Sequence, residues 1–101
     1  MAAYFVSRHA GALEWAARRG ISAERVEHLD VGRIAPGDIV MGTLPVHLAA
    51  AVHARGARYL HLEMTVPASE RGIGLSADDM DRCGARLTEY RVIPADPADG
   101  A

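Results

Sequence analysis

The sequence predicts one compact α/β domain in which a mostly parallel sheet is flanked by helices. Its 101 residues match the usual size of a single domain, and 50% of them are hydrophobic, which allows a core without disulfides or a metal. Short apolar runs that suit buried strands alternate along the chain with segments of helical composition. The order strand, helix, strand, strand, helix, strand, helix, strand predicts parallel pairing with right-handed crossovers.

The first strand and the first helix are predicted close to the N-terminus. Residues 3–7 form an apolar, aromatic and β-branched run that ends in a polar loop, which is typical of a buried strand. Apolar and charged residues mix over 11–19, and Gly20 follows at the position that favours glycine after a helix. Charged and less polar residues alternate over 24–29, which indicates an exposed edge strand.

A central strand and a second helix are predicted next. Residues 39–42 form a continuous apolar run after a Pro-Gly-Asp turn, as expected of a central strand in a parallel sheet. Thr43 is a favourable N-cap and Pro45 suits the first helical turn. The second helix should therefore begin at 43–45 and continue as far as Gly56.

The C-terminal half contains an internal echo. Residues 55–64 and 82–92 both run from a helix end through a glycine into a strand-like segment, which predicts a final strand at 86–93. The same residues also fit a helix that continues from Ser76, and that alternative stays open. Ser76 itself begins a sequence that resembles a capping box, at the start of the predicted third helix.

Two segments lie outside these predicted elements. Residues 65–74 form a glycine-bearing loop that is long enough to act as a lid or a binding loop. Residues 94–101 are rich in Asp, Ala, Pro and Gly, which predicts a disordered C-terminal tail. The folded domain is therefore expected to occupy 1–93.

Composition restricts the classes of function. The formal net charge of −2 argues against a general binder of long DNA or RNA, which needs many basic contacts to phosphates. No apolar run approaches the length of a membrane span, and the N-terminus lacks a signal-peptide pattern, so we expect a cytoplasmic protein. The single cysteine, Cys83, is expected to be a buried or half-buried helix residue. All 11 basic residues are arginine, so a phosphate would be recognised by guanidinium and backbone N–H groups.

Two polar loops follow the first and third predicted strands. Ser7-Arg8-His9 leaves the first strand, and Gly42-Thr43-Leu44-Pro45 leaves the third. In a parallel sheet these loops meet at the carboxyl edge and lead to helix N-termini, where ligands bind. Two hydroxyls, one guanidinium, one imidazole and a glycine would suit a phosphate. The simpler alternatives stay open: the hydroxyls of Ser7 and Thr43 only cap helices, Arg8 pairs with a surface acid, and His9 is solvated.

The remaining candidates give weaker signals. His47 and His53 are six residues apart on the second helix and do not share a face, while His61 lies in a strand two residues before Glu63. No metal site is predicted from this spacing. Arg71 lies in the glycine-bearing loop, where it either closes over an anionic ligand or is solvated.

Several ordered blocks of the sequence resemble a known family. They comprise residues 4–16, 42–46, 56–62 and 71–80, and the similarity runs from residue 4 to about residue 92. These blocks are similar to small CRISPR-associated accessory proteins encoded beside type III systems. The resemblance implies a Rossmann-like fold similar to the CRISPR-associated sensor domains, which bind cyclic oligoadenylates across a homodimer.

The resemblance also implies an activity. Relatives of this kind look like ring nucleases, which cut cyclic tetra-adenylate without a metal or a cofactor. On that analogy, Arg8 and Arg71 would hold phosphate, Ser7 and Thr43 would orient oxygens, His9 would be the acid or base, and Gly42 and Leu44 would contact the ligand. The alternatives are a module that binds the ring without cutting it, and an accessory subunit that docks onto a larger CRISPR component.

Overall fold

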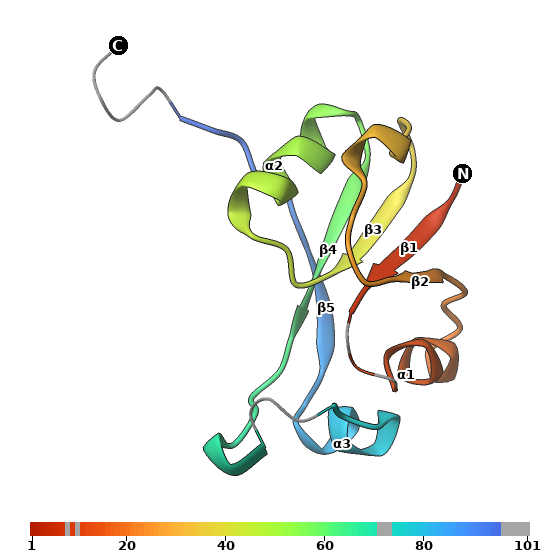
Figure 1. The fold of residues 1–101 in the computed structure, drawn as a ribbon, viewed down its shortest axis with the longest axis vertical. Coiled ribbons are helices and arrows are strands. Elements are labelled where there is room, and N and C mark those ends of the chain that lie inside the picture. The colour runs from red at the N-terminus through yellow and green to blue at the C-terminus, as the bar shows by residue number, and fades with distance from the viewer. Residues whose placement is uncertain (8, 10, 71–73, 96–101) are drawn as a thin grey trace.

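In the residues that the structure describes, five strands form a single sheet. They are Ala3–Val6 (β1), Glu24–Val26 (β2), Ile39–Gly42 (β3), Arg58–Glu63 (β4) and Arg86–Tyr90 (β5). The structure is a computed structural model and describes residues 1–7, 9, 11–70 and 74–95. The strand order is β2-β1-β3-β4-β5, with the first four parallel and β5 antiparallel to β4 (Figure 1). The predicted fold class, an α/β domain with a mostly parallel sheet, is therefore confirmed.

The helices cover both faces of the sheet (Figure 1). In the described residues they are Ala12–Arg18 (α1), Val46–Ala54 (α2) and Ala77–Arg82 (α3), with short 3₁₀ helices at Val31–Arg33 (η1) and Ala68–Glu70 (η2). The helices α1 and α3 pack on one face, and α2 and η1 pack on the other. Among the helices in the described part of the chain, none is both long enough and apolar enough to cross a membrane.

Alternation along the strands divides the core into two layers. Phe5, Met41 and Leu62 point to the face of α1 and α3, where Phe5 meets Trp15 edge to face with ring centroids 6.4 Å apart. Val40 and Tyr59 point to the other face and pack against α2. The three central strands, β1, β3 and β4, therefore place successive side chains in opposite layers, which buries an apolar core on both sides of one sheet.

The last strand resolves the alternative that the sequence left open. The chain leaves α3 at Cys83, which is buried as expected, and Gly84 then adopts φ +73°. A positive φ is accessible to glycine and ends the helix, so the chain turns into β5 and does not continue as a helix. The strand Arg86–Tyr90 is three residues shorter than the predicted 86–93.

The edge strand and the first two helices occupy the predicted regions with shorter bounds. The strand β2 lies at the edge of the sheet, as predicted, but ends at Val26 and not at residue 29. The helix α2 begins at Val46, because Pro45 has the extended ψ of 147° that is typical of the residue before a helix. The prediction that Thr43 caps this helix is wrong, since Pro45 occupies that position without a side-chain cap.

Candidate functional site

A cleft of about 650 Å³ lies at the carboxyl ends of β1 and β3. The two loops singled out from the sequence both line it, through Ser7 and His9 on one side and Thr43 to Pro45 on the other. The connection after β2 closes a third side with Glu27, His28 and Leu29. The cleft therefore lies where the topology of a parallel sheet places ligands.

The loop after β1 is held by hydrogen bonds to neighbouring elements. Ser7 donates its backbone N–H to Val26 at 3.2 Å, and the Ser7 carbonyl accepts from Nε of Arg25 at 3.1 Å. The Ser7 hydroxyl accepts from the backbone N–H of His9 at 3.0 Å. Ser7 therefore stabilises its own loop and is not the N-cap of α1, a position that Gly11 occupies.

His9 is fixed by the segment that precedes α3. Its Nδ1 accepts the backbone N–H of Leu75 at 3.1 Å, and the N–H of Gly11 binds the Leu75 carbonyl at 3.1 Å. Nδ1 is therefore occupied as an acceptor, and the ring proton of a neutral His9 lies on Nε2. Gly11 makes this contact possible, because a Cβ there would collide with the backbone of Ser76 and Ala77.

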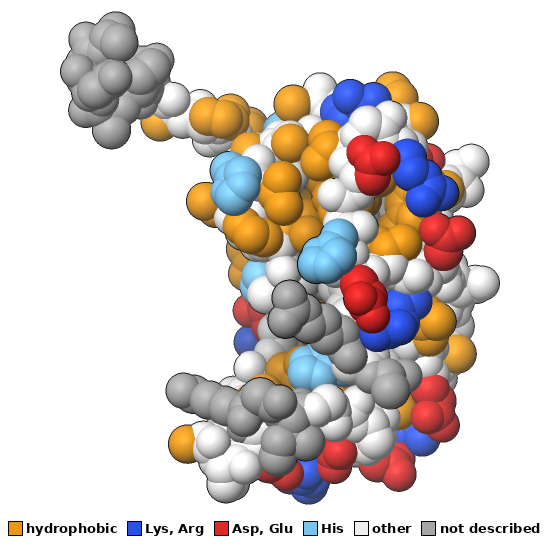
Figure 2. All heavy atoms as spheres, in the orientation of Figure 1, with side chains coloured by type: hydrophobic (Ala, Val, Ile, Leu, Met, Phe, Trp, Pro, Cys, Tyr) orange, Lys and Arg blue, Asp and Glu red, His pale blue; other side chains and the backbone are white. Residues whose placement is uncertain are grey.

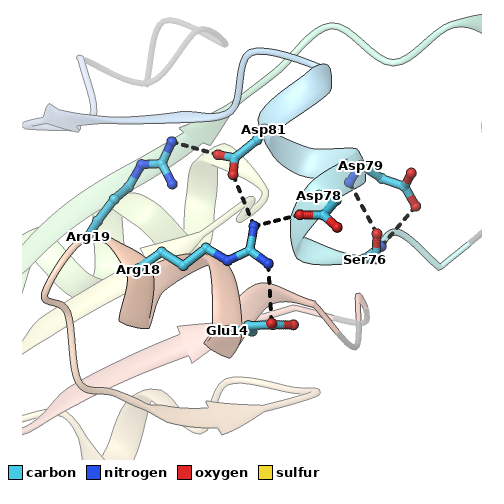
Figure 3. A network of polar contacts seen from close by, with 7 residues as sticks. All are labelled: Glu14, Arg18, Arg19, Ser76, Asp78, Asp79 and Asp81. Carbon is cyan, nitrogen blue, oxygen red and sulfur yellow. Dashed lines mark hydrogen bonds and ion pairs between the residues drawn. The ribbon is translucent and has the colours of Figure 1, made fainter.

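Ion pairs between α1 and α3 support the contact of His9 and Gly11 with Leu75 (Figure 3). Arg18 reaches Asp78 at 2.8 Å and Asp81 at 3.2 Å, and Arg19 reaches Asp81 at 2.8 Å. These arginine contacts, the largest of them hydrogen bonding from Arg19, hold the pKa of Asp81 below its usual range. Because the groups are exposed, the network orients the two helices and contributes little to the stability of the fold.

The loop after β3 is held by hydrogen bonds to Tyr59, a residue of the neighbouring strand β4. Its buried hydroxyl donates to the Gly42 carbonyl at 3.1 Å and accepts the backbone N–H of Leu44 at 2.9 Å. Burial raises the pKa of Tyr59, so the hydroxyl stays protonated at neutral pH. Gly42 adopts φ +137°, and a Cβ at this position would collide with the Val6 carbonyl. The path of the loop thus depends on one glycine and one tyrosine.

A second hollow of about 480 Å³ lies beside the cleft, over the ends of β4 and β5. Thr43 and Leu62 line both cavities, so the two hollows meet at the end of β3. His61 and Glu63 line the second hollow from β4, and Arg86 lines it from β5. His61 Nδ1 lies 2.6 Å from the Tyr59 hydroxyl.

Glu63 is the acid of this second hollow. It accepts the Tyr90 hydroxyl at 3.1 Å and an Arg86 N–H at 3.4 Å. Hydrogen bonds from Thr88 and Tyr90, together with the charge of Arg86, hold its pKa below the usual range, so it is ionised at neutral pH. Its oxygens are therefore engaged by β5.

The structure brings together most of the residues predicted for the site. Ser7, His9, Thr43 and Leu44 line one cleft, and Gly42 lies buried at the start of the second loop. Arg8 and Arg71 lie outside the described residues. In the part of the chain that the structure describes, no group of three or more His, Cys, Asp or Glu residues could hold a metal ion.

Tyr59, His61 and Arg25 were not among the predicted site residues. Arg25 reaches the first loop from the edge strand, and Tyr59 reaches the second loop from β4. A signal for two of them was present in the sequence: the two-residue period of a strand places Tyr59 and His61 on the same face. Only the packing of that face beneath the β3 loop gives the two residues a role at the site.

A family model described as "Putative CRISPR-associated protein (Cas_VVA1548)" matches residues 4–93. No curated protein and no solved structure matches the chain significantly.

Proposed function

Because the chain belongs to the Cas_VVA1548 family of CRISPR-associated proteins, we propose that it is a ring nuclease that acts on cyclic tetra-adenylate. It would bind this second messenger of type III CRISPR defence in the cytoplasm and cut it without a metal, which switches off the antiviral signal. The cleft shared by the loops after β1 and β3 is the observation on which the proposal depends.

The shape and chemistry of the cleft support a nucleotide ligand. Its volume of about 650 Å³ lies in the usual range for small-molecule sites, and its walls combine apolar side chains with a few polar groups. Ser7 and Thr43 bring hydroxyls, and three backbone segments approach one another at the carboxyl edge of the sheet. Arg8 adjoins this cleft in the sequence, and a guanidinium is the group that binds phosphate best.

Cleavage of the ring depends on the positioning of its reacting groups, because the substrate itself supplies the nucleophile. A ribose 2′-hydroxyl held in line with the adjacent phosphate attacks it and leaves a 2′,3′-cyclic phosphate and a 5′-hydroxyl. We assign Arg8 and Arg71 to the phosphate charge and Ser7 and Thr43 to the orientation of oxygens. His9 has its Nδ1 occupied by Leu75, so its Nε2–H would act as a hydrogen-bond donor to the phosphate.

A ring of four nucleotides calls for two copies of the chain. One cleft of this size encloses only part of such a ligand, whereas a twofold dimer presents the same loops to both halves. The exposed surface of α2 supports association: Val46 is 72% exposed, and no Asp, Glu, Lys or Arg occurs over residues 39–54. Figure 2 shows hydrophobic side chains gathered over α2 on one face of the molecule.

The proposal is tested by offering the purified protein cyclic tri-, tetra- and hexa-adenylate and separating the products by chromatography. We expect the tetra-adenylate peak to disappear and linear fragments to appear. Retention of an intact ring with tight binding would instead identify a non-catalytic sensor or sink. A protein that binds none of the three rings would be a docking subunit of a larger CRISPR component.

A further inference from the structure

We propose that His61 is the general base that removes the proton from the attacking 2′-hydroxyl, and that Tyr59 orients it. The inference rests on the proposed cleavage of cyclic tetra-adenylate and adds a residue to its mechanism. His61 lines the hollow beside the main cleft, and Thr43 lines both, so a ring too large for the cleft would extend toward this imidazole.

The hydrogen bonds of Tyr59 determine which nitrogen of His61 carries a proton. Tyr59 has one hydroxyl proton, and it is donated to the buried Gly42 carbonyl at 3.1 Å. The same oxygen accepts the Leu44 N–H at 2.9 Å. With its proton on Gly42, the hydroxyl can only accept in the 2.6 Å contact with His61, whose direction depends on the histidine tautomer, so we infer that Nδ1–H is the donor. A neutral His61 therefore has its lone pair on Nε2. In the described part of the chain, that nitrogen has no hydrogen-bond partner.

The two histidines of the joined cavities have opposite tautomers. His9 accepts at Nδ1 from Leu75 and carries its proton on Nε2, which makes it a donor. His61 donates at Nδ1 to Tyr59 and offers a lone pair at Nε2, which makes it a base. An imidazole oriented by an oxygen at Nδ1 is the arrangement that general-base catalysis requires. The donor and the base thus line two adjacent hollows that share Thr43 and Leu62.

The other candidate bases are less suitable. Glu63 lies on the same face, but bonds from Tyr90 and Arg86 occupy its oxygens, and its lowered pKa makes it a weaker base. His28 lines the cleft but is exposed, and no hydrogen bond orients its ring among the described residues. The groups around His61 are thus Tyr59 and Glu63 from β4, Arg86, Thr88 and Tyr90 from β5, and Thr43 from the loop after β3.

The step balances in atoms and charge. The proton of the 2′-hydroxyl moves to Nε2 of His61 as the 2′-oxygen forms a bond to phosphorus. The bond between phosphorus and the 5′-oxygen breaks, and the leaving 5′-oxygen takes a proton from water. The imidazolium of His61 then returns its proton to the resulting hydroxide, which restores the neutral ring and one water molecule.

The tautomers are tested first, without reference to activity. Nitrogen-15 spectra of the histidine rings in the full protein should show His61 with its proton on Nδ1 and His9 with its proton on Nε2. Tyr59→Phe should abolish the Nδ1–H preference of His61 while leaving that of His9 unchanged. A wild-type His61 with its proton on Nε2 would overturn the inference, whatever the activity of the protein.

The catalytic role is tested by single-turnover cleavage of cyclic tetra-adenylate as a function of pH. His61→Asn should lower the rate by roughly 100- to 10,000-fold and remove the fall in rate at acid pH. Tyr59→Phe should show a smaller loss of the same kind. His53→Asn is the matched control, because His53 lies in the last turn of α2 and lines neither hollow.

Two negative results have different meanings. A wild-type protein that leaves the ring intact would refute the proposed function and this inference with it. A wild-type protein that cuts, beside a folded His61→Asn variant with the same rate and pH profile, would overturn the inference alone. Thermal unfolding of each variant confirms that it is folded.

Discussion

Tyr59 connects the buried core to the site through a single hydroxyl. Its ring packs in the layer beneath α2, while its oxygen contacts Gly42, Leu44 and His61. Because burial keeps this hydroxyl protonated, the contacts persist across the physiological pH range. A core residue therefore positions the loop after β3.

Gly42 is expected to be intolerant of any side chain. Gly42→Ala adds the cost of a positive φ, about 1 to 2 kcal/mol, and the collision with the Val6 carbonyl, which adds roughly 1 to 3 kcal/mol. Gly20→Ala is the matched control, because its φ is +75° and nothing lies within 4 Å of the added Cβ. Urea unfolding should rank Gly42→Ala well below Gly20→Ala. Equal losses would show that the close approach to Val6 is absent.

Asp38 should make stability depend on pH. Its carboxylate accepts the backbone N–H groups of Ala2 and Ala35, both at 2.9 Å, and these bonds lower its pKa in the folded state. A lowered folded pKa stabilises the fold above the unfolded pKa, and this contribution is lost as the pH falls through the folded value. The difference in unfolding free energy between wild type and Asp38→Asn should therefore shrink from neutral to acid pH. A constant difference would contradict this account.

The short helix α3 places the backbone that fixes His9. Ser76 and Asp79 form a complete capping box at its start, with the Ser76 hydroxyl accepting the Asp79 N–H at 3.1 Å. Leu75, the residue before the cap, makes the two backbone contacts with His9 and Gly11. The beginning of one helix thus determines the orientation of an imidazole on another segment.

Loss of this cap should affect both stability and activity. Ser76→Ala is expected to cost about 1 kcal/mol and to lower the cleavage rate, because Leu75 loses its fixed position. Ser22→Ala provides the control, since Ser22 is exposed in the connection before β2. Thermal unfolding and ring cleavage measured on both variants test the prediction. If the Ser76→Ala protein is destabilised but cuts the ring at the wild-type rate, the helix cap has no role in positioning the site.

The sequence predicts the central strands well because continuous apolar runs specify them. Strand composition located residues 39–42, and topology then placed the loops after β1 and β3 at one edge of the sheet. The roles of Ser7 and Thr43 as helix caps were wrong, because side-chain type does not reveal the path of a loop. The Tyr59 hydroxyl contacts Leu44 and Gly42, which lie 15 and 17 positions away in the sequence, and no local pattern encodes these two contacts.

The whole molecule should act as a dimer. A homodimer whose twofold axis passes near Ser7, His9 and Thr43 would complete the site, and light scattering should give twice the mass of one chain. Val46→Asp places a charge on the exposed apolar surface of α2 and should weaken association without unfolding the chain. A monomer in the presence and absence of cyclic tetra-adenylate would refute the dimeric site.

Single-turnover cleavage of saturating cyclic tetra-adenylate in EDTA tests the proposed ring nuclease activity directly. The wild type should cut the ring without added metal, because the attacking 2′-hydroxyl belongs to the substrate. Arg8→Ala should then lose more activity than His9→Ala, since removing a group that stabilises transition-state charge commonly costs about 100- to 1,000-fold. Cleavage that requires a metal, or an Arg8→Ala protein that cuts at the wild-type rate, would contradict the proposed mechanism.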